Sequence, residues 1–145
     1  MPHSVEQRAI TAEAANTAVC AAVAKAQELG IRINAAVTDA SGVLAAFLRM
    51  PGAFLHSVDI AIDKAYTAAG FGFATSQWLG ALQGDEALRL GMPQRPRNVV
   101  FSGGLPIREA GVLIGGVGVS GGSAEQDELC ARAALAALGL EATTT

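Results

Sequence analysis

The fold is decided by the stretch Val112-Leu113-Ile114-Gly115-Gly116-Val117-Gly118-Val119-Ser120-Gly121-Gly122-Ser123-Ala124-Glu125-Gln126-Asp127. Its apolar first half predicts a buried strand. Ser123 followed by Gln126 three residues later is a capping-box pattern, which predicts the start of a helix. Backbone N–H groups should therefore gather at the turn Gly118 to Gly122. Together with the helix dipole they suit a carboxylate, a phosphate or a cofactor propionate, although the glycine spacing matches no nucleotide-binding motif.

Outward from this stretch, apolar periodicity and turn residues predict helices around hairpin-connected strands, which is the pattern of an α+β fold with an antiparallel sheet. The expected elements are a helix ending at Gly30, strands at Ile31–Thr38 and Val43–Met50, a helix capped by Ser57 and ending at Gly70, helical turns within 75–83, an irregular segment from Gly84 to Pro96, strands at Asn98–Ser102, Leu105–Glu109 and Val112–Ser120, and a helix from about Ala124 to Leu138.

Composition limits the class of protein. The 145 residues suit a single domain, 1–145, that buries a sizeable core. A formal net charge of −3, no basic stripe and 5% aromatic residues argue against a nucleic-acid partner. The N-terminus lacks a secretory signal pattern and no stretch is long enough to span a membrane, so we expect a cytoplasmic protein. The two cysteines, Cys20 and Cys130, are expected to be buried free thiols.

Five motifs occur in the order seen in one known family. They are Ala36-Val37-Thr38-Asp39-Ala40-Ser41-Gly42, Phe47-Leu48-Arg49-Met50-Pro51-Gly52-Ala53, Ile60-Ala61-Ile62-Asp63-Lys64-Ala65-Tyr66-Thr67-Ala68, Ser102-Gly103-Gly104-Leu105-Pro106-Ile107 and Gly118-Val119-Ser120-Gly121-Gly122. With these motifs the chain resembles the GlcG/HbpS-like proteins, also called the DUF336 or heme-degrading-domain family, over about residues 10 to 140.

The resemblance implies a profilin-like α+β domain with a five-stranded antiparallel sheet between helices, and a homo-oligomer (dimer, tetramer or octamer). It also implies heme or another tetrapyrrole as the ligand, because family members are associated with heme binding and redox sensing. Fold-level analogy alone does not establish a function, so the site residues must carry the argument.

Two cations are candidates for holding an anion at the glycine turn. Arg49 ends the second expected strand, and Lys64 lies in mid-helix among small apolar residues. If both face the turn, they complete an anion pocket. Alternatively, Arg49 pairs with a nearby acid (Asp39, Asp59 or Asp63) and Lys64 extends to solvent. The turn residues expected at the ligand are Ser120, Gly121 and Gly122.

A second glycine turn, Gly103-Gly104-Leu105-Pro106, has two interpretations. It is either a simple bend between strands, where glycine permits positive φ, or bare backbone that lines the same cleft as the first turn. In the second case Gly103 and Gly104 contact the ligand and Pro106 keeps the rim rigid.

Asp127 either complements the dipole of the last helix or orients Lys64. A heme iron would need an axial donor, and His56 lies just before the Ser57 cap, near Arg49. A surface histidine without a ligand is the alternative. Met50 and Met92 are thioether candidates that otherwise pack in the core or at a rim. Metal-ligand spacing is absent from the sequence, so no metal site is expected.

Three functions fit these observations. The first is small-ligand binding, with heme or another tetrapyrrole held by Arg49, Lys64 and the glycine turns. The second is a small catabolic enzyme, isomerase-like or lyase-like, that binds a carboxylate substrate and uses Lys64 as acid or base, assisted by Asp127. The third is a non-catalytic oligomeric accessory protein whose glycine turns pack subunits together.

Overall fold

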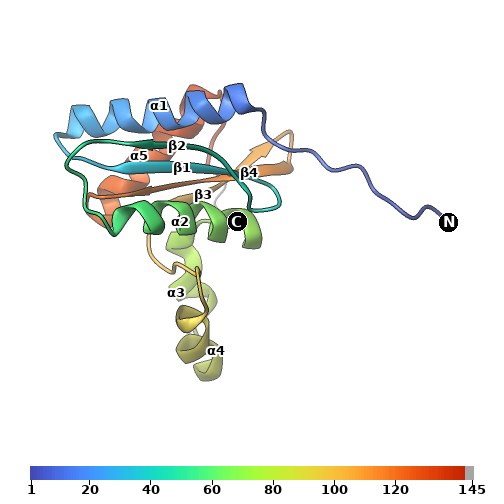
Figure 1. The fold of residues 1–145 in the computed structure, drawn as a ribbon. Coiled ribbons are helices and arrows are strands. Elements are labelled where there is room, and N and C mark those ends of the chain that lie inside the picture. Colours follow the sequence, from blue (N-terminus) through green and yellow to red (C-terminus); the bar gives the residue numbers. More distant parts are fainter. Residues whose placement is uncertain (143–145) are drawn as a thin grey trace.

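The computed structural model describes residues 1–142, which form a layer of antiparallel strands between helices (Figure 1). In chain order the elements are α1 (Ala12–Leu29), β1 (Asn34–Asp39), β2 (Leu44–Arg49), α2 (Ser57–Phe71), η1 (Thr75–Gln77), α3 (Trp78–Ala81), α4 (Glu86–Gly91), η2 (Met92–Gln94), β3 (Gly104–Glu109), β4 (Val112–Ser120) and α5 (Ala124–Ala137). The α+β class expected from the sequence is confirmed.

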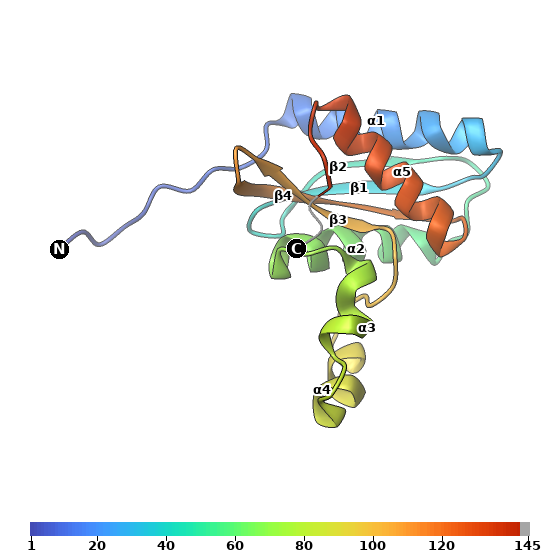
Figure 2. The same cartoon turned by 180° about the vertical axis from the view of Figure 1, so that it is seen from behind.

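The sheet has the strand order β2-β1-β4-β3, and each pair of neighbours is antiparallel. α1 and α5 pack together over one face, while α2 covers the other face (Figures 1 and 2). The short helices α3 and α4 extend away from the sheet beyond α2 (Figure 2). We call residues 78–91 the α3–α4 arm.

Glycines in β4 allow α2 to lie very close to the sheet. A Cβ atom at Gly116 would collide with the carbonyl oxygen of Ala65, and one at Gly118 with the carbonyl oxygen of Ala61. Side chains alternate between the faces of a strand, so Val117 and Val119, which alternate with these glycines, belong to the core on the α1–α5 side instead. The glycine-rich strand therefore places the middle of α2 directly over the centre of the sheet.

The larger hydrophobic core lies between the sheet and the α1–α5 pair. Many of its helical residues are alanines, which let helices and strands approach closely but bury little area each. The core on the α2 side is smaller and consists of Ala36, Ala61 and Ala65, with Phe47 and Ile62 packed against it.

The prediction of a fifth strand at Asn98–Ser102 is wrong, because the sheet has four strands and this segment is not one of them. The N–H of Val99 donates to Thr67 Oγ1 at 3.1 Å, and the N–H of Asn98 to the carbonyl of Arg95 at 3.2 Å. These donors are used by α2 and by the preceding turn, so they cannot form a ladder with a neighbouring strand. Residues 98–102 therefore have a sequence that favours a strand but do not form one.

Two expectations for α2 also need correction. Ser57 is the first helical residue and not the cap: its hydroxyl accepts a hydrogen bond from Asn34 Nδ2 at 2.6 Å, and His56 occupies the N-cap position. The helix also continues past Gly70 and ends at Gly72, whose φ of 79° provides the left-handed C-cap. A mid-helix glycine with helical neighbours did not terminate the helix.

The segment expected to be irregular between Gly84 and Pro96 contains α4 and the 3-10 turn η2. Asp85 caps α4 by accepting the N–H of Leu88 at 3.1 Å. Gly91 and Pro93 end the short helix but do not prevent it.

The cysteines differ from one another. Cys130 on α5 is buried as expected, whereas Cys20 on α1 is exposed, which corrects the expectation of two buried thiols. The turn between β1 and β2 behaves as its sequence suggests, because Asp39 Oδ1 accepts the N–H of Ser41 at 2.8 Å and of Val43 at 3.1 Å. No helix within residues 1–142 is long and apolar enough to cross a membrane.

Candidate functional site

A buried ion pair joins α2 to α5 at the end of β4. Lys64 Nζ donates to Asp127 Oδ2 at 3.1 Å and to the carbonyl oxygen of Val119 at 2.8 Å. The side chains of Lys64 and Asp127 are 1% and 4% exposed. Lys64 therefore does not extend to solvent, and the sequence alternative in which Asp127 orients Lys64 matches this geometry.

The glycine turn at the start of α5 already holds a carboxylate, and that carboxylate belongs to the chain. Asp127 Oδ1 accepts the N–H of Gly122 at 2.8 Å, and Gly121 provides a further backbone hydrogen bond to the same group. The capping box forms as its sequence predicts, with Ser123 and Gln126 bonded reciprocally. The donors expected to bind an external anion thus point at Asp127.

Burial dominates the electrostatics of this pair. Desolvation lowers the pKa of Lys64, while the attraction and hydrogen bond of Asp127 act in the opposite direction. Desolvation likewise raises the pKa of Asp127 against the opposing effects of Lys64 and the N–H groups of Gly122 and Gly121. The ring of Phe101 lies 5.0 Å from Lys64 Nζ and helps to cover it.

The second glycine turn makes room for Lys64. A Cβ at Gly103, where φ is 124°, would lie 2.6 Å from both Lys64 Nζ and the carbonyl oxygen of Val119. One at Gly104 would lie 2.6 Å from the carbonyl oxygen of Lys64. This turn and the Gly121–Gly122 turn therefore surround the same ion pair, and Pro106 is buried in the edge strand β3, opposite Gly116.

Arg49 belongs to a different cluster of hydrogen bonds. Its guanidinium donates to Asn34 Oδ1 at 3.3 Å and to the carbonyl oxygen of Ala53 at 2.9 Å. Asn34 pairs with the buried Ser120 across β1 and β4 and with the Ser57 hydroxyl, so this cluster holds the start of α2 to the sheet.

None of the three acids suggested as partners of Arg49 forms an ion pair with it within residues 1–142; Asp63 instead pairs with Arg97 at 2.9 Å. His56 is exposed and makes no side-chain capping bond. Ligand binding by Arg49, His56, Ser120 and the glycines stays a prediction. So does a catalytic role for Lys64 and Asp127, which would require access to a nitrogen that is now enclosed.

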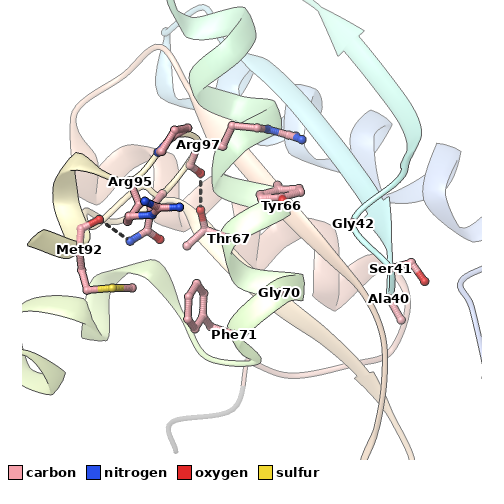
Figure 3. A pocket seen from close by; sticks show the side chains of 12 residues that line it. Ala40, Ser41, Gly42, Tyr66, Thr67, Gly70, Phe71, Met92, Arg95 and Arg97 are labelled. Carbon is pink, nitrogen blue, oxygen red and sulfur yellow. Dashed lines mark hydrogen bonds between the residues drawn. The ribbon is translucent and has the colours of Figure 1, made fainter. Parts of the chain in front are cut away.

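A hollow of about 370 Å³ lies elsewhere, beside the C-terminal half of α2 (Figure 3). We call it the α2 pocket. Its walls come from α2, from the β1–β2 turn and from the segment that follows α4. The lining residues are Ala40, Ser41, Gly42, Tyr66, Thr67, Gly70, Phe71, Met92, Arg95, Pro96, Arg97 and Asn98. Its volume falls within the range of small-molecule sites.

Arg97 anchors one wall of the α2 pocket in an unusual backbone conformation. Its φ is 64°, which is rare for a residue with a Cβ. The carbonyl oxygen of Arg97 accepts the Thr67 hydroxyl at 2.8 Å, and its guanidinium lies 3.6 Å from the Tyr66 ring centre while pairing with Asp63. Contacts from α2 to backbone and side chain thus fix this residue at the rim.

Arg95 and Asn98 complete the polar part of the pocket. Arg95 is exposed and forms no ion pair within residues 1–142, so its guanidinium is available to an anion. Asn98 Nδ2 donates to the carbonyl oxygen of Met92 at 2.8 Å, and its Oδ1 is a buried acceptor with no hydrogen-bond partner among the described residues.

The apolar part of the pocket is built on an aromatic cluster. Phe71 lines the pocket and packs edge-on against Trp78, with ring centres 4.7 Å apart. Phe73 packs against Trp78 from another side at 4.9 Å. The thioether of Met92 points toward Phe71 (Figure 3). The α2 pocket therefore has an apolar end at Phe71 and Met92, and Arg95 and Arg97 also line it.

Sequence reasoning did not connect these residues, apart from naming Met92 as a thioether candidate. The available signal was the run Met92-Pro93-Gln94-Arg95-Pro96-Arg97, in which two prolines restrict the backbone of a segment that carries two arginines. A restrained, cationic loop is better suited to binding than a merely irregular one. What the sequence could not show is that this loop faces Tyr66 and Phe71 on α2.

A second hollow, of about 390 Å³, lies near the start of α2 and is lined by Gly30, Ile31, Arg32, Gly52, Ala53, Phe54 and Gly121. Neither Lys64 nor Asp127 lines either hollow. Within residues 1–142, no group of three or more His, Cys, Asp or Glu side chains could hold a metal ion.

Comparison with known families places this fold. A model described as "Haem degrading protein HbpS-like" matches residues 10–136. The chain belongs to the HbpS-like family. A similar protein is the uncharacterized 15.0 kDa protein in the dhaT-dhaS intergenic region of Citrobacter freundii, which is 40% identical over 136 residues, or 93% of this HbpS-like chain and 96% of the relative.

Two further similar proteins are named for a corrinoid and for heme. The corrinoid adenosyltransferase PduO of Citrobacter freundii is 39% identical over 121 residues, which cover 83% of this HbpS-like chain but only 36% of PduO. A crystal structure of a PduOC–heme complex is 35% identical, with a TM-score of 0.86, and the match covers 94% of this chain and 99% of that one.

Proposed function

We propose that this protein binds a tetrapyrrole, with heme as the candidate, in the α2 pocket. The observation that carries the proposal is the close structural similarity, at a TM-score of 0.86, to a relative solved as a heme complex. The α2 pocket supports it, because this pocket joins apolar and aromatic surface to unpaired cationic charge.

The chemistry of the lining residues fits the group. Heme is a flat apolar ring system with two carboxylates on one edge. Phe71 and Pro96 offer apolar surface, and the planar guanidinium of Arg95 suits a carboxylate. The backbone of Arg97, held by Thr67, and its guanidinium, paired with Asp63, keep this residue fixed at the rim. Bound iron would provide redox and ligand-binding chemistry; the protein would bind and orient the ring and exclude water from its apolar part.

Titration with hemin tests the proposal. We expect a saturable shift of the Soret band and weaker binding to Arg95→Gln, since a charge-assisted carboxylate contact is lost. Arg132→Gln on α5, where Arg132 pairs with Glu128, is the matched control and should bind as the wild type does. Hemin dimethyl ester, which lacks both carboxylates, should bind wild type and Arg95→Gln equally. Absence of saturable hemin binding would refute the proposed function.

We also propose that the protein is a homo-oligomer. The α3–α4 arm exposes Leu79, Leu88 and Leu90 at 67%, 46% and 55%, and such short helices gain little stability without packing partners. Light scattering should report a mass above that of one chain, and Leu88→Glu with Leu90→Glu should reduce it. Thr17→Glu with Gln27→Glu, at two exposed positions of α1, is the control for the added negative charge alone. A wild-type mass equal to one chain would refute this proposal.

A further inference from the structure

We propose that the second hollow, near the start of α2, is a binding site for a small organic carboxylate. We call it the Arg32 hollow. It is separate from the α2 pocket, because no residue lines both, and this proposal does not depend on heme binding. Its volume of about 390 Å³ is in the range of small-molecule sites.

Two glycine turns hold Arg32 in the wall of this hollow. Gly52 has a φ of 88°, and a Cβ there would collide with Arg32 Nη1 and lie 3.0 Å from Arg32 Cδ. A Cβ at Gly121 would collide with the carbonyl oxygen of Arg32. The side chain of Arg32 therefore lies against one turn and its backbone against the other, which restricts where the guanidinium can be.

The charge of Arg32 has no partner in the protein. Its guanidinium is exposed and forms no hydrogen bond or ion pair within residues 1–142. The other six residues that line the hollow are glycine, alanine, isoleucine or phenylalanine, so no acid in the wall competes for it. Because arginine stays protonated in proteins, the hollow attracts an anion.

Backbone donors in the same wall are also free. The N–H groups of Arg32, Gly52 and Phe54 donate to no acceptor in the described part of the chain. In contrast, the N–H groups of Gly121 and Gly122 are used by Asp127. A planar guanidinium beside unsatisfied N–H groups suits the two oxygens of a carboxylate.

The rest of the wall is apolar, which favours an organic anion over an inorganic one. Phe54 lines the hollow and is 72% exposed, and Leu55 beside it in the chain is 76% exposed. Ile31 and Ala53 add aliphatic surface. A ligand whose aromatic or aliphatic body packs on Phe54 while its carboxylate contacts Arg32 would cover this surface, whereas a phosphate ion would leave it in water.

Titration with 3-phenylpropionate, followed by amide chemical shifts in NMR, tests the proposal. The N–H signals of Gly52 and Gly121 report on the Arg32 hollow, while those of Gly42 and Gly70 report on the α2 pocket. We expect saturable shifts at Gly52 and Gly121. The neutral analogue 3-phenylpropionamide should bind at least about tenfold more weakly, because it lacks the charge that pairs with arginine.

Two variants separate the charged and apolar contacts. Arg32→Gln should weaken 3-phenylpropionate binding at least about tenfold, whereas the control Arg8→Gln, which removes the same charge from an exposed arginine paired with Glu109, should bind as the wild type does. Phe54→Ala should weaken binding of 3-phenylpropionate but not of acetate, which has no body to pack on the ring. Both variants change exposed side chains, so circular dichroism should show an unchanged fold.

The outcomes also separate this proposal from heme binding. Unchanged affinity in Arg32→Gln, or shifts confined to Gly42 and Gly70, would overturn the carboxylate site. Inorganic phosphate binding as tightly as 3-phenylpropionate would overturn the ligand class. Hemin should bind Arg32→Gln as it binds the wild type, so a failure of hemin binding refutes the proposed function and leaves the Arg32 hollow supported by its own titration.

Discussion

Removing one charge of the Lys64–Asp127 pair is expected to destabilise the protein strongly. The two side chains are 1% and 4% exposed, so a charge left without its partner cannot be solvated. Asp127→Asn keeps an amide oxygen that can still accept the N–H of Gly122, which isolates the effect of the charge. Breaking a buried pair from one side typically costs about 3–5 kcal/mol of unfolding free energy.

Lys64→Met should cost less than Asp127→Asn. The Asp127 carboxylate would keep the N–H groups of Gly121 and Gly122, whereas Lys64 without Asp127 keeps only the carbonyl oxygen of Val119. The double variant removes both charges and should recover part of the loss, giving a coupling energy of about 2 kcal/mol or more.

Urea denaturation of the four proteins, followed by circular dichroism, gives these free energies. The control is the helix-surface pair Lys25–Glu28, with N···O at 3.2 Å and side chains 35% and 71% exposed, whose removal should cost less than about 0.5 kcal/mol. An Asp127→Asn cost as small as that of the control would refute the electrostatic reasoning. So would a double variant whose loss equals the sum of the single losses.

The same pair predicts a pH dependence with a definite sign. Burial raises the pKa of Asp127 above its ordinary 3.8, so at pH values just above 3.8 this carboxyl binds more protons in the folded state than in the unfolded state. The contribution of Asp127 to the free energy of unfolding therefore falls as the pH rises through this range. Because burial lowers the pKa of Lys64 below its ordinary 10.5, the unfolded state binds the extra proton in the window beneath 10.5, and stability rises with pH there. The wild type should therefore be least stable, relative to the double variant, at intermediate pH.

Three further predictions concern single positions. Gly103→Ala should lower the free energy of unfolding by more than about 2 kcal/mol, because the position has a positive φ and the new Cβ would lie 2.6 Å from Lys64 Nζ. Gly111→Ala is the control, since Gly111 also has a positive φ but no atom within 4 Å of the new Cβ, and it should cost about 1–2 kcal/mol in thermal or urea unfolding. In thiol labelling of the folded protein, exposed Cys20 should react and Cys130 should not, because burial raises the pKa of the Cys130 thiol to about 11; equal labelling rates would contradict this. Thr67→Val should lower the free energy of unfolding in urea by about 1–3 kcal/mol, because it leaves the Val99 N–H without its acceptor, and it should also weaken hemin binding. The control Thr17→Val on α1 should change neither quantity. Unchanged hemin affinity in Thr67→Val would show that Thr67 does not support the ligand site.

Much of the fold could be predicted from local patterns in the sequence. The apolar run before Ser123 and the capping box after it identify β4 and the start of α5. Turn chemistry identifies the hairpin, since Asp39 accepts N–H groups within its own turn. These features depend on residues close together in the chain, which is why a single sequence reveals them.

What could not be predicted depends on contacts between distant residues. Val99 looks like part of a strand, but its N–H donates to Thr67, 32 positions away. Arg49 and Lys64 looked like one anion pocket, yet the structure gives each a different set of partners. The α2 pocket joins residues from three separate segments, and no spacing rule relates them.

The ion pair at the end of β4 also has a consequence for how the molecule opens. α2 and α5 lie on opposite faces of the sheet, and Lys64 and Asp127 connect them around the strand end. Detaching either helix alone would leave one charge of the pair without its partner in an apolar interior. The free energy of detaching one helix is therefore nearly that of detaching both. Amide hydrogen exchange in α2 and α5 should therefore proceed as one cooperative event, and a bond between two side chains makes a layered sandwich behave as a single unit.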